Sequence, residues 1–196
     1  MALFSGLAAV AWLVIIALLH FIKPGLNPSV RMISEYALAP SGWIMQLAFF
    51  LMAASCVALA FAAWALLPHL GLLLLGTCGV GFAGAGIFVT DPRCTAKAAT
   101  KSGLLHNVFS FIVILLFPIM TTVVGAHMAG NTAWASVHAW LPVCSVLAWA
   151  GFVAFVGSAV YAGKYKETPL GYFQRFMVLT YTTWLAVVAF AMAIGP

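Results

Sequence analysis

Long apolar runs and short polar segments alternate along this chain. A helix needs about 20 mostly apolar residues to cross the hydrocarbon core of a bilayer. Six runs reach that length, at about residues 3–22, 43–66, 70–90, 103–126, 135–162 and 170–194. The pattern predicts an all-α polytopic membrane protein, in which residues 1–196 form one membrane domain with a bundle of six transmembrane helices.

Local signals mark several ends of the predicted helices. Pro68 favours a break between the second and third runs, because proline cannot continue a helix. Asp91 and Pro92 should close the third helix. Thr100 and Ser102 are alternative N-caps for the fourth helix, since a hydroxyl there accepts a hydrogen bond from a free backbone N–H group.

The basic residues predict the orientation of the bundle. All eight Lys and Arg residues lie in, or at the edge of, the segments after the first, third and fifth runs: Lys23, Arg31, Arg93, Lys97, Lys101, Lys164, Lys166 and Arg175. Short cytoplasmic loops retain Lys and Arg. We therefore expect loops 23–42, 91–102 and 163–169 in the cytoplasm and both termini on the external side.

Composition and charge argue against several classes of function. The chain is 65% hydrophobic and 6% charged, whereas soluble domains are about half apolar and about a quarter charged, so a soluble enzyme is excluded. The formal charge of +5 predicts no nucleic-acid partner, because basic loops beside an anionic inner leaflet explain it. The expected location is a cell membrane, specifically a bacterial inner membrane, and the expected partners are membrane lipids.

The third run, residues 70–90, is rich in glycine. Glycine lets helix backbones approach closely in lipid and pack by van der Waals contact. This pattern favours either a place for the third helix at the centre of the bundle or homo-oligomer formation through that helix. The spacing of the small residues does not choose between them.

Charge is costly in or beside a bilayer, so the acidic residues are informative. Glu35 lies in a partly apolar first loop, and Asp91 directly follows the third run. His20, His106 and Arg175 lie near predicted helix ends at the same cytoplasmic level. Two interpretations stay open. These side chains converge on one polar pocket, or each reaches water separately while Arg175 pairs with one acid.

Several of these residues stand in motifs. The order is His20, KPGLNP (23–28), ISEYALAPSGW (33–43), Asp91-Pro92, GLLH (103–106) and GYFQRF (171–176). In this order, and over most of the chain, the sequence resembles the domain-of-unknown-function family 998 of six-span membrane proteins. The resemblance implies fold and membrane placement but no activity. The positions that match its motifs are Ser34, Glu35, Tyr36, Asp91, Pro92, His106, Gln174 and Arg175.

We predict a cytoplasm-facing polar pocket that binds a lipid headgroup or a similar small ligand. Its predicted ligand-binding residues are Ser34, Glu35, Tyr36, Asp91, His106, Gln174 and Arg175. Arg175 and the loop lysines would hold an anionic headgroup, because basic pockets at cytoplasmic helix ends recognise such groups by charge. Binding needs no catalysis, so the sequence favours a protein that is not an enzyme. It does not decide whether the protein catalyses a reaction.

One alternative is an intramembrane metal-dependent hydrolase. His20, Asp91 and His106 would be the zinc ligands and Glu35 the base, since zinc sites combine His and carboxylate ligands with an open position. Against this alternative, none of these residues lies three or four positions from another on a helix.

A further alternative is a haem-binding membrane protein. Haem bound between helices takes a pair of histidines. Such a pair must come from one level of the membrane, for example His127 and His138 on the external side. The sequence predicts no cofactor, and zinc and haem both stay open as possibilities.

Overall fold

The computed structural model describes residues 1–38, 40–93, 98–131, 134, 137–164 and 168–195. Its long helices are α1 (Ala2–Ile22), α2 (Trp43–Ala62), α3 (His69–Ile87), α4 (Lys101–Ala129), α5 (Trp140–Lys164) and α6 (Leu170–Ile194). A short 3-10 helix, η1 (Ile33–Ala37), lies between α1 and α2. Residues 94–97 and 165–167 of the predicted loops, and residues 135–136 of the predicted fifth helix, lie outside the described residues.

All six long helices are long and apolar enough to cross a membrane. Their outward faces carry large exposed apolar side chains, including Phe4, Phe111, Val146 and Val160. Extensive exposed apolar surface is unfavourable in water and is typical of contact with lipid. The predicted all-α architecture with six membrane-spanning helices is confirmed, and the described part of the chain contains no strand.

Several helix ends differ from the prediction. α2 ends at Ala62 rather than near residue 66, because residues 63–67 form tight turns before Pro68. α3 ends at Ile87 rather than near residue 90, and Phe88 already has an extended backbone. Asp91 therefore lies beyond the helix instead of closing it. Pro92 favours an extended backbone at Asp91 itself, and the structure ends the helix four residues before that position.

The fourth and fifth helices also have different bounds. α4 covers Lys101–Ala129 rather than 103–126. Its start is earlier because the Thr100 hydroxyl caps it, accepting from the Gly103 backbone N–H at 3.0 Å. α5 begins at Trp140 rather than near residue 135, because successive tight turns at Trp134 and Val137 precede it.

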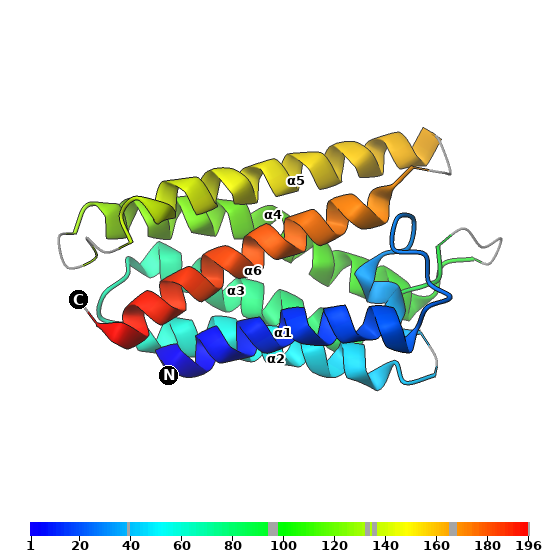
Figure 1. The fold of residues 1–196 in the computed structure, drawn as a ribbon, viewed down its shortest axis with the longest axis horizontal. Coiled ribbons are helices and arrows are strands. Elements are labelled where there is room, and N and C mark those ends of the chain that lie inside the picture. The colour runs from blue at the N-terminus through cyan, green and yellow to red at the C-terminus, as the bar shows by residue number, and fades with distance from the viewer. Residues whose placement is uncertain (39, 94–97, 132–133, 135–136, 165–167, 196) are drawn as a thin grey trace.

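The helices form a closed ring in chain order. Each helix packs against its neighbours in the sequence, and α6 returns to pack against α1 (Figure 1). The start of α1 and the end of α6 lie at one end of the ring, which we call the terminal end (Figure 1). The opposite end, where Lys23, Arg31, Arg93 and Arg175 lie, we call the basic end.

Glycine residues let α3 pack closely on both neighbours. A Cβ added at Gly84 would lie 2.2 Å from the Phe109 ring of α4, and one added at Gly86 would lie 3.1 Å from Phe49 of α2. In the most apolar stretch of α3, 61% of the residues are buried, against 50% or less in every other span. α3 is therefore the most enclosed helix of the ring, and homo-oligomer formation stays a prediction.

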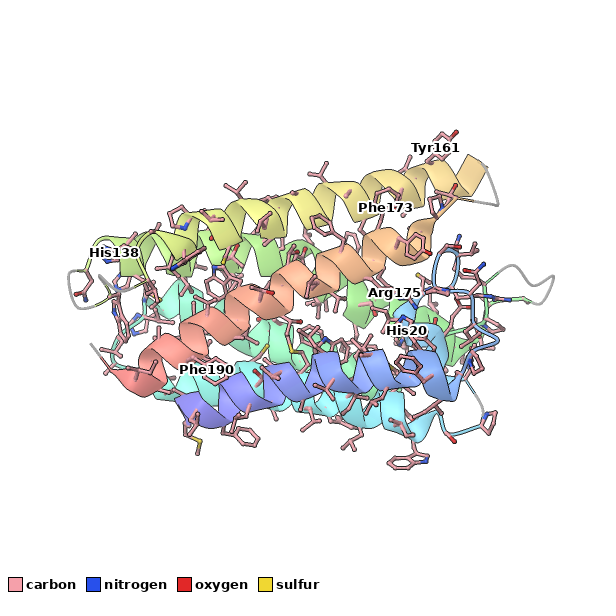
Figure 2. The ribbon with its side chains drawn as sticks, in the orientation of Figure 1. His20, His138, Tyr161, Phe173, Arg175 and Phe190 are labelled. Atoms are coloured by element: carbon pink, nitrogen blue, oxygen red, sulfur yellow. The ribbon has the colours of Figure 1, made fainter. Side chains whose placement is uncertain are left out.

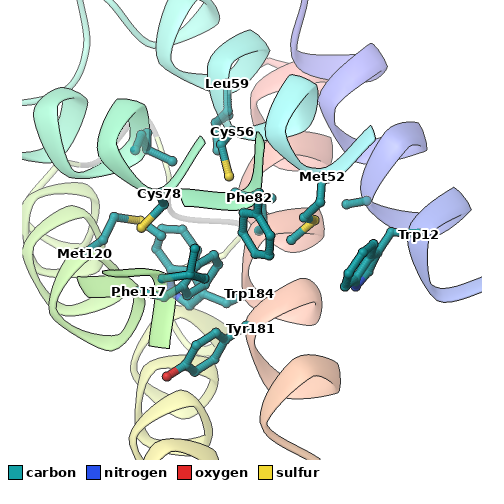
Figure 3. Packing of buried hydrophobic residues seen from close by; sticks show 14 of the residues in the cluster. Trp12, Met52, Cys56, Leu59, Cys78, Phe82, Phe117, Met120, Tyr181 and Trp184 are labelled. Carbon is teal, nitrogen blue, oxygen red and sulfur yellow. The ribbon is translucent and has the colours of Figure 1, made fainter. Parts of the chain in front are cut away.

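Aromatic side chains fill the interior of the ring (Figure 3). Phe117 of α4 stacks on Tyr181 of α6 with ring centroids 4.5 Å apart. Trp12 of α1 packs against Phe49 and Phe82, at centroid distances of 5.2 and 6.0 Å. These contacts hold opposite sides of the ring together across its centre.

Candidate functional site

The segment between α1 and α2 folds back into the basic end of the bundle. All five residues of η1, from Ile33 to Ala37, are buried. A buried segment needs hydrogen-bond partners for its polar groups, because water is excluded from it. Most of the polar residues predicted from the sequence supply these partners.

Glu35 anchors η1 through its carboxylate. It is fully buried and accepts hydrogen bonds from Arg31 Nη1 at 2.9 Å and from the backbone N–H groups of Met32 at 2.8 Å and Arg93 at 2.9 Å. Arg31 Nη1 also donates to the Arg93 carbonyl at 2.9 Å. Both carboxylate oxygens thus have protein donors, and they tie the first loop to the segment after α3.

Arg175 connects α6 to α1 and to the first loop (Figure 2). Its Nε donates to His20 Nε2 at 2.8 Å, and its Nη2 donates to the Tyr36 hydroxyl at 3.2 Å. Its Nη1 donates to three backbone carbonyls, those of Pro28 and Arg31 at 2.9 Å and that of Gly171 at 3.0 Å. The guanidinium also lies 5.8 Å from the centroid of the Tyr36 ring, within the range of a cation–π contact.

The expected pairing of Arg175 with an acid is wrong for the residues that the structure describes. The ion pair at this end joins Arg31 to Glu35 instead. His20 takes the place of an acid beside Arg175. Its Nδ1 lies 2.7 Å from the Ile16 carbonyl, so the hydrogen-bond network assigns the proton to Nδ1 and leaves Nε2 as the acceptor.

Asp91 and His106 fix the connection between α3 and α4. Asp91 accepts from the backbone N–H and from the hydroxyl of Thr100, both at 2.8 Å. Ser102, the alternative cap, donates instead to the Val89 carbonyl at 2.9 Å. His106 is 2% exposed, and its Nδ1 lies 3.0 Å from the Ala85 carbonyl and 2.8 Å from that of Phe88. These contacts satisfy carbonyls at the end of α3.

Lys23 also binds to the first loop. Its ammonium donates to the Tyr36 carbonyl at 2.6 Å and to the Leu38 carbonyl. Partial burial lowers the pKa of this ammonium, because desolvation disfavours the charged form. The cations of the basic end are therefore largely engaged with backbone carbonyls.

A cavity of about 60 Å³ lies inside the ring, beneath η1. Side chains from α1, α2, α3, α4 and α6 line it, and most of them are apolar, for example Trp12, Phe49, Met52 and Phe82. No charged side chain lines it among the described residues. Its polar lining residues are Ser34, Ser110, Gln174, Tyr181 and Thr182.

The polar lining residues differ in whether the protein satisfies them. Tyr181 donates to the Ile114 carbonyl and Thr182 to the Val178 carbonyl, both at 2.8 Å. The side-chain hydroxyls of Ser34 and Ser110 have no hydrogen-bond partner among the described residues. Gln174 Oε1 accepts from the Ile33 backbone N–H at 2.6 Å, which leaves its Nε2 without an acceptor in the described part of the chain.

The structure thus separates the seven predicted site residues into two groups. Ser34 and Gln174 line the cavity. The other five hold the surrounding helix ends and loop: Glu35, Tyr36, Asp91, His106 and Arg175. Sequence reasoning missed Trp12 and Ser110, because a tryptophan or serine within an apolar run gives no sign of which way it faces.

The metal and haem alternatives gain no support from this geometry. No group of three His, Cys, Asp or Glu side chains that could hold a metal ion occurs among the described residues. His127 Nε2 lies 2.9 Å from the Leu66 carbonyl, and His138 Nε2 lies 2.8 Å from that of Asn131, so both rings have partners at the terminal end.

Comparison with known proteins identifies the family. No curated protein and no solved structure matches the chain. A family model described as a protein of unknown function (DUF998) matches residues 7–191, nearly the whole sequence. The matched region includes the first-loop motif, Asp91-Pro92, His106 and Arg175. The chain therefore belongs to the DUF998 family.

Proposed function

We propose that this protein binds a small, mostly apolar ligand, such as part of a membrane lipid, in the cavity beneath η1. The observation that carries this proposal is the set of polar groups without partners on the cavity wall, on Ser34, Ser110 and Gln174. These three groups border the cavity, whereas the fully buried side-chain atoms without a partner among the described residues are Trp12 Nε1 and Trp184 Nε1. Polar groups that the protein itself leaves unpaired are usually paired with water or a ligand. A bound molecule would supply the missing partners.

The proposal assigns different roles to the seven residues predicted from the sequence. Ser34 and Gln174 contact the ligand directly. Glu35, Tyr36, Asp91, His106 and Arg175 hold η1 and the helix ends that enclose it. Arg175 does not bind a headgroup directly, because its N–H groups already donate to His20, to Tyr36 and to backbone carbonyls. No reaction is proposed, since the Glu35 and Asp91 oxygens accept from protein donors.

The distribution of basic residues supports a cytoplasmic location for this site. The basic end carries Lys23, Arg31, Arg93 and Arg175, and short cytoplasmic loops retain such residues. The cavity lies next to η1, so it falls in the cytoplasmic half of the bilayer. Lipids of the inner leaflet are the ligands nearest to it.

Native mass spectrometry of the protein released gently from its membrane tests this proposal. We expect wild type to retain a ligand and Ser34→Ala to retain it about two- to tenfold less, because one hydrogen bond is worth about 0.5–1.5 kcal/mol. Ser34→Ala should leave thermal stability nearly unchanged, since the hydroxyl that it removes bonds to no described residue.

Ser55→Ala is the matched control. Ser55 is also buried, but its hydroxyl bonds to the Ser5 carbonyl at 2.8 Å and it does not line the cavity. This variant should lower thermal stability and keep the ligand. A wild-type protein that carries no bound species, or a Ser34→Ala variant that retains as much as wild type, contradicts the proposal.

A further inference from the structure

We infer that the ligand presents a carbonyl oxygen to Trp12 Nε1–H and reaches the cavity from the bilayer, between α4 and α6. This inference rests on the proposed function and adds to it the chemical class of the ligand and its path.

Trp12 is one of two buried indole donors without a partner among the described residues, and it is the one that lines the cavity. Its side chain is 1% exposed, and its Nε1 has no hydrogen-bond partner among the described residues. An indole N–H can only donate, and a buried one usually finds an acceptor. Trp12 lines the cavity with Met52, Phe82 and Tyr181, and Figure 3 shows these four side chains around the same interior region.

The free polar groups of the cavity are mainly donors. Trp12 Nε1 and Gln174 Nε2 can only donate, whereas the hydroxyls of Ser34 and Ser110 can donate or accept. Among the described lining residues, none has a free group that can only accept, and none is charged. This balance fits a neutral ligand whose polar atoms are acceptor oxygens. A carbonyl on an apolar chain meets both requirements.

Two sources share that chemistry. One is the ester carbonyl of a neutral glycerolipid, and the other is the ring carbonyl of a quinone with an apolar tail. Both combine a carbonyl acceptor with an apolar body that suits a wall of aromatic and aliphatic side chains.

The size of the cavity limits how the ligand binds. A volume of about 60 Å³ has room for only about four to six water molecules, at about 10–15 Å³ each. A whole lipid is much larger than this. Only the part that carries the carbonyl can therefore enter, and the rest of the ligand must stay in the bilayer.

The seam between α4 and α6 is the path that the fold leaves for such a ligand. η1 covers the basic end of the bundle with its buried residues. α5 packs on both α4 and α6, and these two helices have few direct contacts with each other. The cavity-lining residues on this seam are only partly buried: Ser110, Ile114, Gln174 and Val178.

Nuclear magnetic resonance of the full chain in dodecyl maltoside tests the contact, because this detergent has no carbonyl. The chain has seven tryptophans, so an indole-¹⁵N spectrum resolves few signals. Trp12→Phe and Trp184→Phe assign the two that matter. Trp184 is the matched control, since it is also fully buried with a free Nε1 but does not line the cavity.

The probes are dioctanoylglycerol, its dioctyl ether counterpart and decylubiquinone. We expect a carbonyl probe to move the Trp12 indole proton downfield and to leave that of Trp184 in place. The ether counterpart should bind more weakly. Trp12→Phe should weaken binding of the carbonyl probe about two- to tenfold, the worth of one hydrogen bond, whereas Trp184→Phe should not.

The outcomes separate this inference from the proposed function. A response to dioctanoylglycerol alone assigns an ester, and a response to decylubiquinone alone assigns a quinone. Binding that leaves the Trp12 signal unmoved, or a native ligand with no binding of either carbonyl probe, overturns the inference and keeps the proposed function. A Trp12 signal already downfield in ligand-free protein identifies ordered water as the partner and also overturns it. No bound species in any measurement overturns both. If Trp12→Phe does not fold, replacing the other six tryptophans one at a time assigns the Trp12 signal, and its shift in the wild type decides.

Discussion

Buried charge is best understood at the scale of single residues, and Glu35 is the clearest case. Its side chain is fully buried and accepts from one guanidinium and two backbone N–H groups. Its partner Arg31 is 34% exposed, so water screens the ion pair on one side. The carboxylate therefore contributes to stability mainly by satisfying buried donors rather than by attraction between charges.

Glu35→Gln should lower the free energy of unfolding by about 1–3 kcal/mol, because an amide cannot accept on both sides and leaves a buried donor unpaired. Arg31→Gln should cost less, about 1 kcal/mol, since water screens the pair on the Arg31 side and glutamine still offers an N–H donor to the carboxylate. Unfolding of both variants in dodecyl maltoside measures the difference. Equal losses would show that the ion pair, not the backbone contacts, is what matters.

At the scale of helices, the glycines of α3 set how closely its neighbours approach. Those facing α4 and α2 leave little room for a methyl group, as at Gly84 against Phe109 and at Gly86 against Phe49. Gly76 on the same helix has no atom within 4 Å of an added Cβ. Close packing is thus confined to particular faces of α3.

Gly84→Ala should destabilise the bundle by about 1–3 kcal/mol, because the new methyl group would force the Phe109 ring away from α3. Gly76→Ala should be neutral or stabilise by up to about 1 kcal/mol, since alanine favours a helix more than glycine does. Thermal unfolding of the two variants makes the comparison. A destabilising Gly76→Ala would instead indicate a partner on that face, such as a second copy of the chain.

At the scale of the whole molecule, the described Lys and Arg residues gather at one end of the ring of helices. Both chain termini lie at the other end (Figure 1). This asymmetry is the physical basis for the proposed orientation, because basic residues stay on the cytoplasmic side. The cavity lies nearer the basic end, next to η1. Orientation would therefore decide which leaflet supplies the proposed ligand.

Cysteine labelling in intact cells tests the orientation. The background is Cys94→Ser, since Cys56, Cys78 and Cys144 are buried. Gly130→Cys, exposed at the terminal end, should react with a membrane-impermeant maleimide. Gly25→Cys, exposed at the basic end, should react only after the cells are opened. The reverse pattern would place the cavity in the external leaflet.

Much of the architecture was predictable from the sequence, because the length and hydropathy of one segment are enough to identify a membrane span. The six spans, the Thr100 cap and the family all followed from short stretches of residues. The polar residues singled out from the sequence lie together at the basic end, and their role in a site stays a prediction. The sequence could not predict which of these residues line the cavity and which hold the surrounding helix ends and loop. The same positions along the chain are compatible with several sets of hydrogen-bond partners.

The sequence by itself determined how many helices cross the membrane and which end of the bundle is basic. Only the tertiary structure decided the ring order, the early end of α3, the partners of Glu35 and Arg175, and the cavity with its free donors. The physical reason is that nearly every helix face is apolar in a membrane bundle, so periodicity does not reveal the inward face. The decisive hydrogen bonds join residues distant in the chain, such as Gln174 with Ile33 and Arg175 with His20.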